Sequence, residues 1–135
     1  MQKMILPGEC DSTFLQTVPS SIQIADFLSK DEYNKLLACN IVVMHVYNSS
    51  ANNTVLECIE RNTPIIINKH PAVCEYLGEK YPLYISTAKE ISDFVISKNF
   101  LETICAAHLY LKHMDKSRFQ LPTFIKGIKL ILDHL

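Results

Sequence analysis

Two short, nearly continuous runs of β-branched and other apolar residues constrain this chain more than any other feature. The runs are residues 41–47 (IVVMHVY) and residues 64–68 (PIIIN). Such runs are typical of strands buried on both faces of a parallel sheet, because helices cover both sides of these sheets. The 16 residues between the runs leave room for one helical crossover. We therefore predict two adjacent central strands, Ile41–Tyr47 and Pro64–Asn68, that pair in parallel.

Helix signals alternate with the apolar runs along the chain. Residues 29–32 (SKDE) and 87–90 (TAKE) form capping boxes, and Asn99 with Glu102 is expected to cap a further helix. Strands that alternate with helices predict an α/β fold, here a Rossmann-like parallel sheet flanked by helices, with a helical C-terminus. Residues 3–6 form a short apolar run that a Pro7-Gly8 turn closes. Further strands are expected at residues 21–25 and 81–86, and further helices at residues 55–61, 72–77 and after Pro122.

Length and charge narrow the class of protein. The 135 residues fit one domain, with a core at residues 21–86 and C-terminal helices at residues 87–135. The net charge is −1 and the basic residues are scattered, so the composition gives no argument for a nucleic acid or an acidic membrane as partner. No apolar run approaches the roughly 20 residues that span a bilayer, and residues 1–7 are too short for a signal peptide. A cytoplasmic location is expected.

The cysteines and histidines indicate structural roles. The five cysteines form no C-x-x-C pair, so reduced and buried thiols are expected rather than a zinc site or disulfides. His45 lies within an apolar run and is expected to be a core histidine. His108 and His113 are five residues apart, off a common helix face, and predict no zinc pair.

The segment from Asn48 to Glu57 is the main candidate for chemistry. A polar loop leaves the end of the first buried strand and enters a helix. Ligands of parallel sheets bind beyond the carboxyl ends of the strands, and the first N–H groups of a helix attract anions. The backbone of Asn53, Thr54 and Val55 could therefore bind a diphosphate, with Glu57 about one turn further on. The alternative is that these polar residues only cap the helix.

Residues 41–85 resemble the late donor-binding segment of GT-B glycosyltransferases. The stretch NTVLECIERNTPIIINKHPAVCEYLG follows the order typical of that family, with a helix carrying a glutamate, a G/N-T-P turn, a strand and a loop before a second helix. The resemblance implies a nucleotide-sugar donor as substrate, with no cofactor and no metal. It implies that Glu57 binds the ribose hydroxyls and that the backbone at Asn53, Thr54 and Val55 holds the diphosphate.

The same resemblance places the loop with Lys69 and His70 near the donor, although a solvated turn is the alternative for these two residues. Ser49 stands where the family usually has a first glutamate, eight residues before Glu57. The implied function is the donor-binding half of a glycosyltransferase, completed by an acceptor-domain subunit or by a homodimer. The alternative is a non-catalytic interaction or regulatory module with the same fold.

Overall fold

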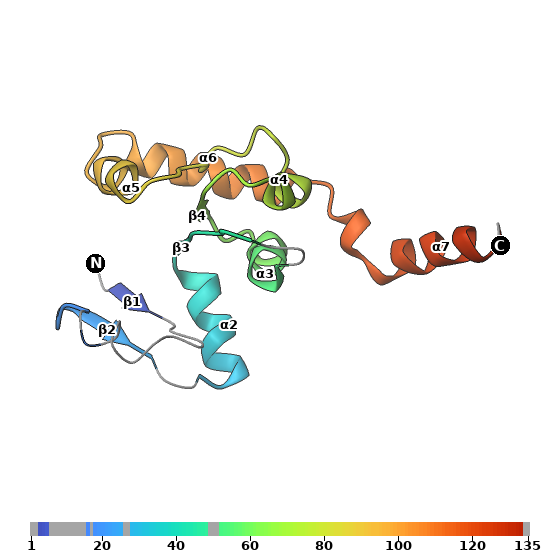
Figure 1. Cartoon of the computed structure of the whole chain (residues 1–135), viewed down its shortest axis with the longest axis horizontal. Helices are drawn as coiled ribbons and strands as arrows, with labels where there is room; N and C mark the ends of the chain where they lie inside the picture. The colour runs from blue at the N-terminus through green and yellow to red at the C-terminus, as the bar shows by residue number, and fades with distance from the viewer. Residues whose placement is uncertain (1–2, 6–15, 17, 26–27, 49–51, 134–135) are drawn as a thin grey trace. The chain divides into compact units, whose positions relative to one another are not determined.

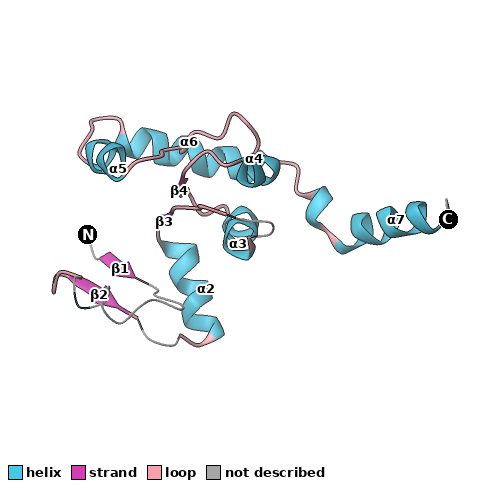
Figure 2. Ribbon diagram, viewed as in Figure 1, coloured by secondary structure: helices cyan, strands magenta, loops and turns pink. Residues whose placement is uncertain are grey.

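The computed structural model describes the whole chain except residues 1–2, 6–15, 17, 26–27, 49–51 and 134–135 (Figure 1). It has an α/β fold in which short parallel strands alternate with helices, followed by a helical C-terminal region (Figure 2). The chain forms two compact units, Met1–Leu36 and Leu37–Leu135. No helix in the described ranges is both long and apolar enough to cross a bilayer.

The first unit contains a parallel pair of strands and the start of a helix. Strand β1 (Lys3–Ile5) pairs with β2 (Ile22–Ile24), and α2 (Lys30–Cys39) follows. The predicted capping box is present, since the Ser29 N–H donates to Glu32 Oε2 at 2.9 Å and the Glu32 N–H donates to Ser29 Oγ at 3.3 Å. The Ser29 hydroxyl also donates to Glu32 Oε2 at 2.6 Å, and this bond together with that from the Ser29 N–H lowers the pKa of the Glu32 carboxyl. The reciprocal bonds stabilise the start of α2.

The second unit contains the predicted central strands. Strand β3 (Val42–Met44) and strand β4 (Ile65–Ile67) pair in parallel, with Val43 opposite Ile66, and α3 (Asn53–Arg61) connects them. This β3–α3–β4 unit has a Rossmann-like arrangement and confirms the predicted parallel pairing. The carboxyl ends of both strands, and the loops that follow them, therefore lie at one edge of the pair.

The burial of the strands departs from the prediction in two places. All three residues of β4 are buried, as expected, but Val43 in β3 is 57% exposed, so the prediction that this strand is buried on both faces is wrong. The third strand of this unit, predicted at residues 81–86, is reduced to a parallel bridge between Tyr84 and Ile67. Beyond this bridge the Ile65 N–H donates to the Tyr81 hydroxyl (2.9 Å) instead of to a backbone carbonyl, and the ladder does not continue.

The helices of the second unit after β4 mostly begin at the predicted signals. Thr87 and Glu90 form the expected capping box. Asn99 is the N-cap residue of α6, as predicted, but its side chain makes no capping hydrogen bond. The elements after β4 are α4 (Pro71–Leu77), α5 (Ala88–Val95), α6 (Phe100–His113), the 3₁₀ turn η1 (Ser117–Phe119) and α7 (Leu121–Leu132).

Hydrogen bonds to backbone carbonyls join α6 to the rest of the second unit. The Tyr110 hydroxyl donates to the Leu77 carbonyl at the end of α4 (2.8 Å), and His108 Nδ1 lies 2.8 Å from the Asn62 carbonyl at the end of α3. Gly78 follows α4 with a φ of +80°, and a Cβ there would lie 2.8 Å from the Tyr110 hydroxyl oxygen. The position therefore requires glycine, which closes α4 as the sequence predicts.

Thr63 makes a buried hydrogen bond whose loss is expected to destabilise the second unit. Its hydroxyl donates to the Leu37 carbonyl (2.8 Å), one of the carbonyls in the last turn of α2 that have no partner within the helix. We expect Thr63→Val to lower the free energy of unfolding by about 1–3 kcal/mol, because a buried acceptor is left unsatisfied. Urea unfolding measures this change.

Thr103 offers the matched control for this substitution. Its hydroxyl donates to the Asn99 carbonyl (2.9 Å) at an exposed position, where water can replace the lost donor. Thr103→Val is expected to cost less than about 0.5 kcal/mol. Equal losses in the two variants would contradict the role assigned to the Thr63 hydroxyl.

Candidate functional site

The candidate site is the edge of the β3–β4 pair at the carboxyl ends of the strands. Asn52 is the N-cap of α3 on the β3 side of this edge, and its side chain accepts a hydrogen bond from the Val55 N–H at 3.1 Å. Lys69 and His70 follow β4 on the other side. The fold thus brings the two predicted loops to the same edge, as the sequence indicated.

The first turn of α3 contains the predicted diphosphate-binding backbone. Asn53 is exposed and Thr54 is half-buried, and N–H groups in a first helical turn have no acceptor within their own helix. Val55 is fully buried, and its N–H already donates to Asn52. Asn53 and Thr54 are therefore the better placed donors for an anion, whereas Val55 would need Asn52 to move.

Glu57 lies in the second turn of α3 and is half-buried. The Arg61 guanidinium donates to the Glu57 backbone carbonyl at 3.1 Å, which places a basic group on the same helix. The negative charge of Glu57 contributes to raising the pKa of the neighbouring Cys58 thiol, after the larger effect of burial. Ser49, the other candidate on this loop, lies outside the described residues.

Lys69 and His70 both have partners within the chain. Lys69 Nζ lies 2.7 Å from Glu79 Oε2, and this hydrogen-bonded ion pair raises the pKa of the lysine. The ammonium also lies 6.0 Å from the centre of the Tyr84 ring. His70 is the N-cap of α4, and its Nδ1 accepts from the Ala72 N–H at 3.2 Å. Glu79 therefore holds the Lys69 ammonium and offsets its charge, and His70 is held by the first turn of α4.

Asn68 is a residue of this edge that the sequence analysis did not single out. Its side chain accepts from the Val46 N–H (2.7 Å) and donates to the Val46 carbonyl (2.8 Å), as a paired strand residue would do. The primary amide thereby extends the β3–β4 pairing beyond the last ladder residues. The sequence did contain a signal for this contact. An asparagine directly after a buried strand carries both a donor and an acceptor, so its side chain can bond the N–H and the carbonyl of a neighbouring strand.

An exposed pair of rings follows β3 at the same edge. The rings of His45 and Tyr47 have centroids 4.6 Å apart, and Tyr47 is 82% exposed. His45 is exposed as well, and its Nε2 lies 3.1 Å from the Ser86 carbonyl, so the prediction of a core histidine is wrong. Exposed rings at the carboxyl edge of a parallel pair provide a surface on which a planar ligand can stack.

The cysteines divide into buried and exposed thiols. Cys58 is fully buried, which raises the pKa of its thiol to about 12 and makes it a poor nucleophile. Cys39 and Cys105 are exposed, so the expectation of buried thiols is wrong for these two, and Cys74 is half-buried. All four thiols are free, as predicted, and Cys10 lies outside the described residues.

The hydrogen bonds of Asn68 lead to a prediction for the edge of the site. We expect Asn68→Ala to lower the free energy of unfolding by about 2–3 kcal/mol, because it leaves the N–H and carbonyl of the buried Val46 without partners. Hydrogen exchange of the Val46 amide should become at least about tenfold faster, which NMR measures directly. Asn99→Ala is the control, because the Asn99 side chain makes no capping bond. An unchanged Val46 exchange rate would contradict the proposed pairing.

A scan against protein-family models, a search of curated proteins and a search of solved structures each gave no match. Among the residues that the structure describes, no three His, Cys, Asp or Glu side chains gather into a group that could hold a metal ion. The candidate site is an α/β unit with polar, basic and aromatic groups at the carboxyl edge of its two strands.

Proposed function

We propose that this chain is the donor-binding half of a GT-B-type glycosyltransferase, which binds a nucleotide sugar for transfer of the sugar to an acceptor. The observation that carries the proposal is the parallel β3–α3–β4 unit. It brings the first turn of α3 and the Lys69–His70 loop to one edge. Ligands of parallel α/β sheets bind at such an edge.

Three parts of a nucleotide sugar, the diphosphate, the ribose and the base, have a matching group at this edge. The N–H groups of Asn53 and Thr54 and the positive end of the α3 dipole suit the diphosphate, and the Lys69 ammonium adds positive charge. The Glu57 carboxylate suits the two hydroxyls of the ribose. The exposed rings of His45 and Tyr47 suit stacking of the base.

Sugar transfer also needs an acceptor and a catalytic base. In the proposed function these come from a partner, either an acceptor-domain subunit or a second copy of the chain. Positive charges near the diphosphate would stabilise the leaving nucleotide, since charge develops on its oxygens as the sugar departs. The role of the present chain is to bind and orient the donor.

The alternative function is a non-catalytic interaction or regulatory module. One observation favours it: several predicted binding groups already have partners in the chain. The Val55 N–H donates to Asn52, Lys69 pairs with Glu79, and His70 caps α4. Donor binding separates the two functions, because a purely structural edge has no affinity for a nucleotide sugar.

A prediction for Glu57 tests the proposal. A thermal-shift panel of UDP- and GDP-sugars first identifies the donor, and calorimetry then measures its affinity. We expect Glu57→Ala to weaken donor binding roughly ten- to hundredfold, since a charge-assisted hydrogen bond is worth about 1.5–3 kcal/mol. The variant should keep its fold, because Glu57 is only half-buried.

Glu60→Ala is the matched control, because Glu60 is an exposed glutamate on the same helix. It is expected to keep the parent's donor affinity. Equal donor affinity in Glu57→Ala and the parent would refute the role of Glu57. Unfolding of that variant would make Glu57 a structural residue, and no donor binding by the parent would favour the non-catalytic module.

A further inference from the structure

Helix α7 (Leu121–Leu132) presents an apolar face that no described part of the chain covers. At 100° per residue, six of its apolar side chains fall within an arc of about 120°. Each of the six is between 41% and 67% exposed. They are Leu121, Phe124, Ile125, Ile128, Ile131 and Leu132.

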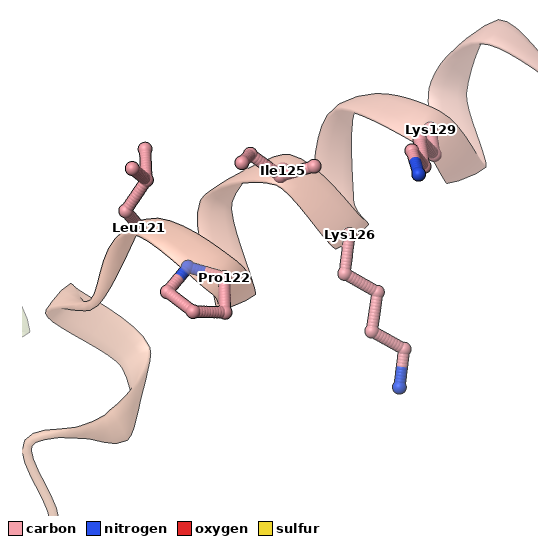
Figure 3. A pocket seen from close by; sticks show the side chains of 5 residues that line it. All are labelled: Leu121, Pro122, Ile125, Lys126 and Lys129. Atoms are coloured by element: carbon pink, nitrogen blue, oxygen red, sulfur yellow. The ribbon is translucent and has the colours of Figure 1, made fainter.

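The surface of α7 is not a pocket for a small molecule. A shallow hollow on it is lined by Leu121, Pro122, Ile125, Lys126 and Lys129, all from this one helix (Figure 3). A site for a small ligand is usually a cleft that buries most of the ligand, whereas one helix leaves the ligand open to solvent. The face as a whole is instead shaped to lie against a larger surface.

Positive charge is concentrated in the part of the sequence that ends with α7. Residues 112–133, from the end of α6 to the C-cap of α7, contain five basic and two acidic residues, a net charge of +3, although the whole chain has a net charge of −1. Lys126 and Lys129 lie on α7 itself, which has no acidic residue between Leu121 and Leu132. A surface that complements this region must therefore be apolar and negatively charged.

The size of the face distinguishes a second copy of the chain from a lipid surface. A helix of 12 residues is about 18 Å long, and one face of it is well below the roughly 800 Å² per partner that a stable interface buries. A lipid surface has no such minimum area, because each apolar side chain enters the acyl boundary independently while nearby lysines contact anionic headgroups.

We propose that α7 binds the surface of an anionic lipid bilayer, with its six apolar side chains inserted and with Lys126 and Lys129 at the headgroups. The helix lies in the plane of the interface and does not cross the bilayer. This binding is independent of the donor site and would hold the second unit of the chain at a membrane.

Vesicle sedimentation of the full 135-residue chain tests the proposal. We expect binding to phosphatidylcholine vesicles that contain 30% phosphatidylserine, and at least about tenfold weaker binding to pure phosphatidylcholine vesicles or in 0.5 M salt. Ile128→Asp and the double variant Lys126→Glu/Lys129→Glu should each weaken binding at least about tenfold. Both substitutions are at exposed positions, and circular dichroism verifies that the fold is kept.

Matched controls are available elsewhere on the chain. Leu101→Asp changes an exposed leucine of α6, and Lys80→Glu/Lys98→Glu reverses two exposed lysines outside residues 112–133. Both should keep the parent's vesicle binding. Absence of binding to anionic vesicles, equal binding to neutral vesicles, or equal losses in the controls would overturn the proposal. A dimer in sedimentation velocity that Ile128→Asp abolishes would assign the face to a second copy instead.

Discussion

Raising the pH from 9 to 12 is expected to destabilise the second unit of this protein progressively. Burial raises the pKa of the Cys58 thiol from 9.0 to about 12, and it also raises the pKa of the Tyr81 hydroxyl above its usual value of 10.0. Both groups are at most 3% exposed, so the folded state holds them in their neutral forms. In the unfolded chain they ionise near their usual pKa values.

The sign of the effect follows from which state releases protons first. Below pH 9 both groups are neutral in both states, and stability does not depend on them. Above pH 9 the unfolded chain binds fewer protons than the folded chain, so stability falls as the pH rises. The rise of the Cys58 pKa from 9.0 to about 12 corresponds to about 4 kcal/mol at pH 12, a large share of the roughly 5–15 kcal/mol typical of a domain.

Urea unfolding at pH values from 8 to 12, in reducing buffer, measures this loss. Cys58→Ala should be somewhat less stable than the parent at pH 8, because a buried sulfur is removed, but it should lose less stability as the pH rises. Cys39→Ala is the control, since Cys39 is exposed and its replacement should leave the pH dependence unchanged. A pH dependence that is the same in all three proteins would show that Cys58 does not control alkaline stability.

The elements that the sequence predicted well have local signals. The capping boxes at Ser29 and Thr87 determine where α2 and α5 begin, because the reciprocal hydrogen bonds involve residues only three apart. The apolar run that became β4 is buried on both faces, as its composition indicated. The parallel pairing followed from the short helical connection between two such runs.

The elements that the sequence predicted poorly depend on distant parts of the chain. Val43 has the β-branched character of a buried strand residue, but its exposure depends on whether another element covers that face of β3. His45 lies in the same apolar run, yet its ring is exposed beside Ser86, which is 41 residues away. A pattern of apolar residues does not contain this information.

In the candidate site, too, some features follow from local signals in the sequence, whereas others depend on distant parts of the chain. The sequence placed the loops after the two strands at one edge, because parallel strands share a direction. The sequence did not show that the Asn52 side chain accepts a hydrogen bond from the Val55 N–H or that Glu79 pairs with Lys69. Nor did it show that the Asn68 side chain accepts a hydrogen bond from the Val46 N–H. These contacts join side chains to groups that only the folded chain brings together, and they decide which candidate residues are available to a ligand.

The 135 residues alone are expected to show no sugar transfer, even if they bind the donor as proposed. Transfer needs donor, acceptor and catalytic base in one geometry, and such positioning can supply about 7–11 kcal/mol of the barrier. The groups proposed to bind the donor are at Asn53, Thr54, Glu57 and Lys69, and in the proposed function the acceptor and the base come from a partner. A donor bound at an edge that is open to water should undergo slow hydrolysis rather than transfer.

Radiolabelled donor turnover by the purified chain measures this expectation, with product separated into free sugar and transferred sugar. One arm uses the chain alone over a range of concentrations, and another adds candidate acceptor-domain proteins. Transfer that appears only with a partner identifies the chain as the donor-binding subunit of an enzyme. Transfer that rises with the square of the chain concentration identifies a homodimer. Robust transfer at the lowest concentration, independent of any partner, would mean that the 135 residues already contain an acceptor site and a base.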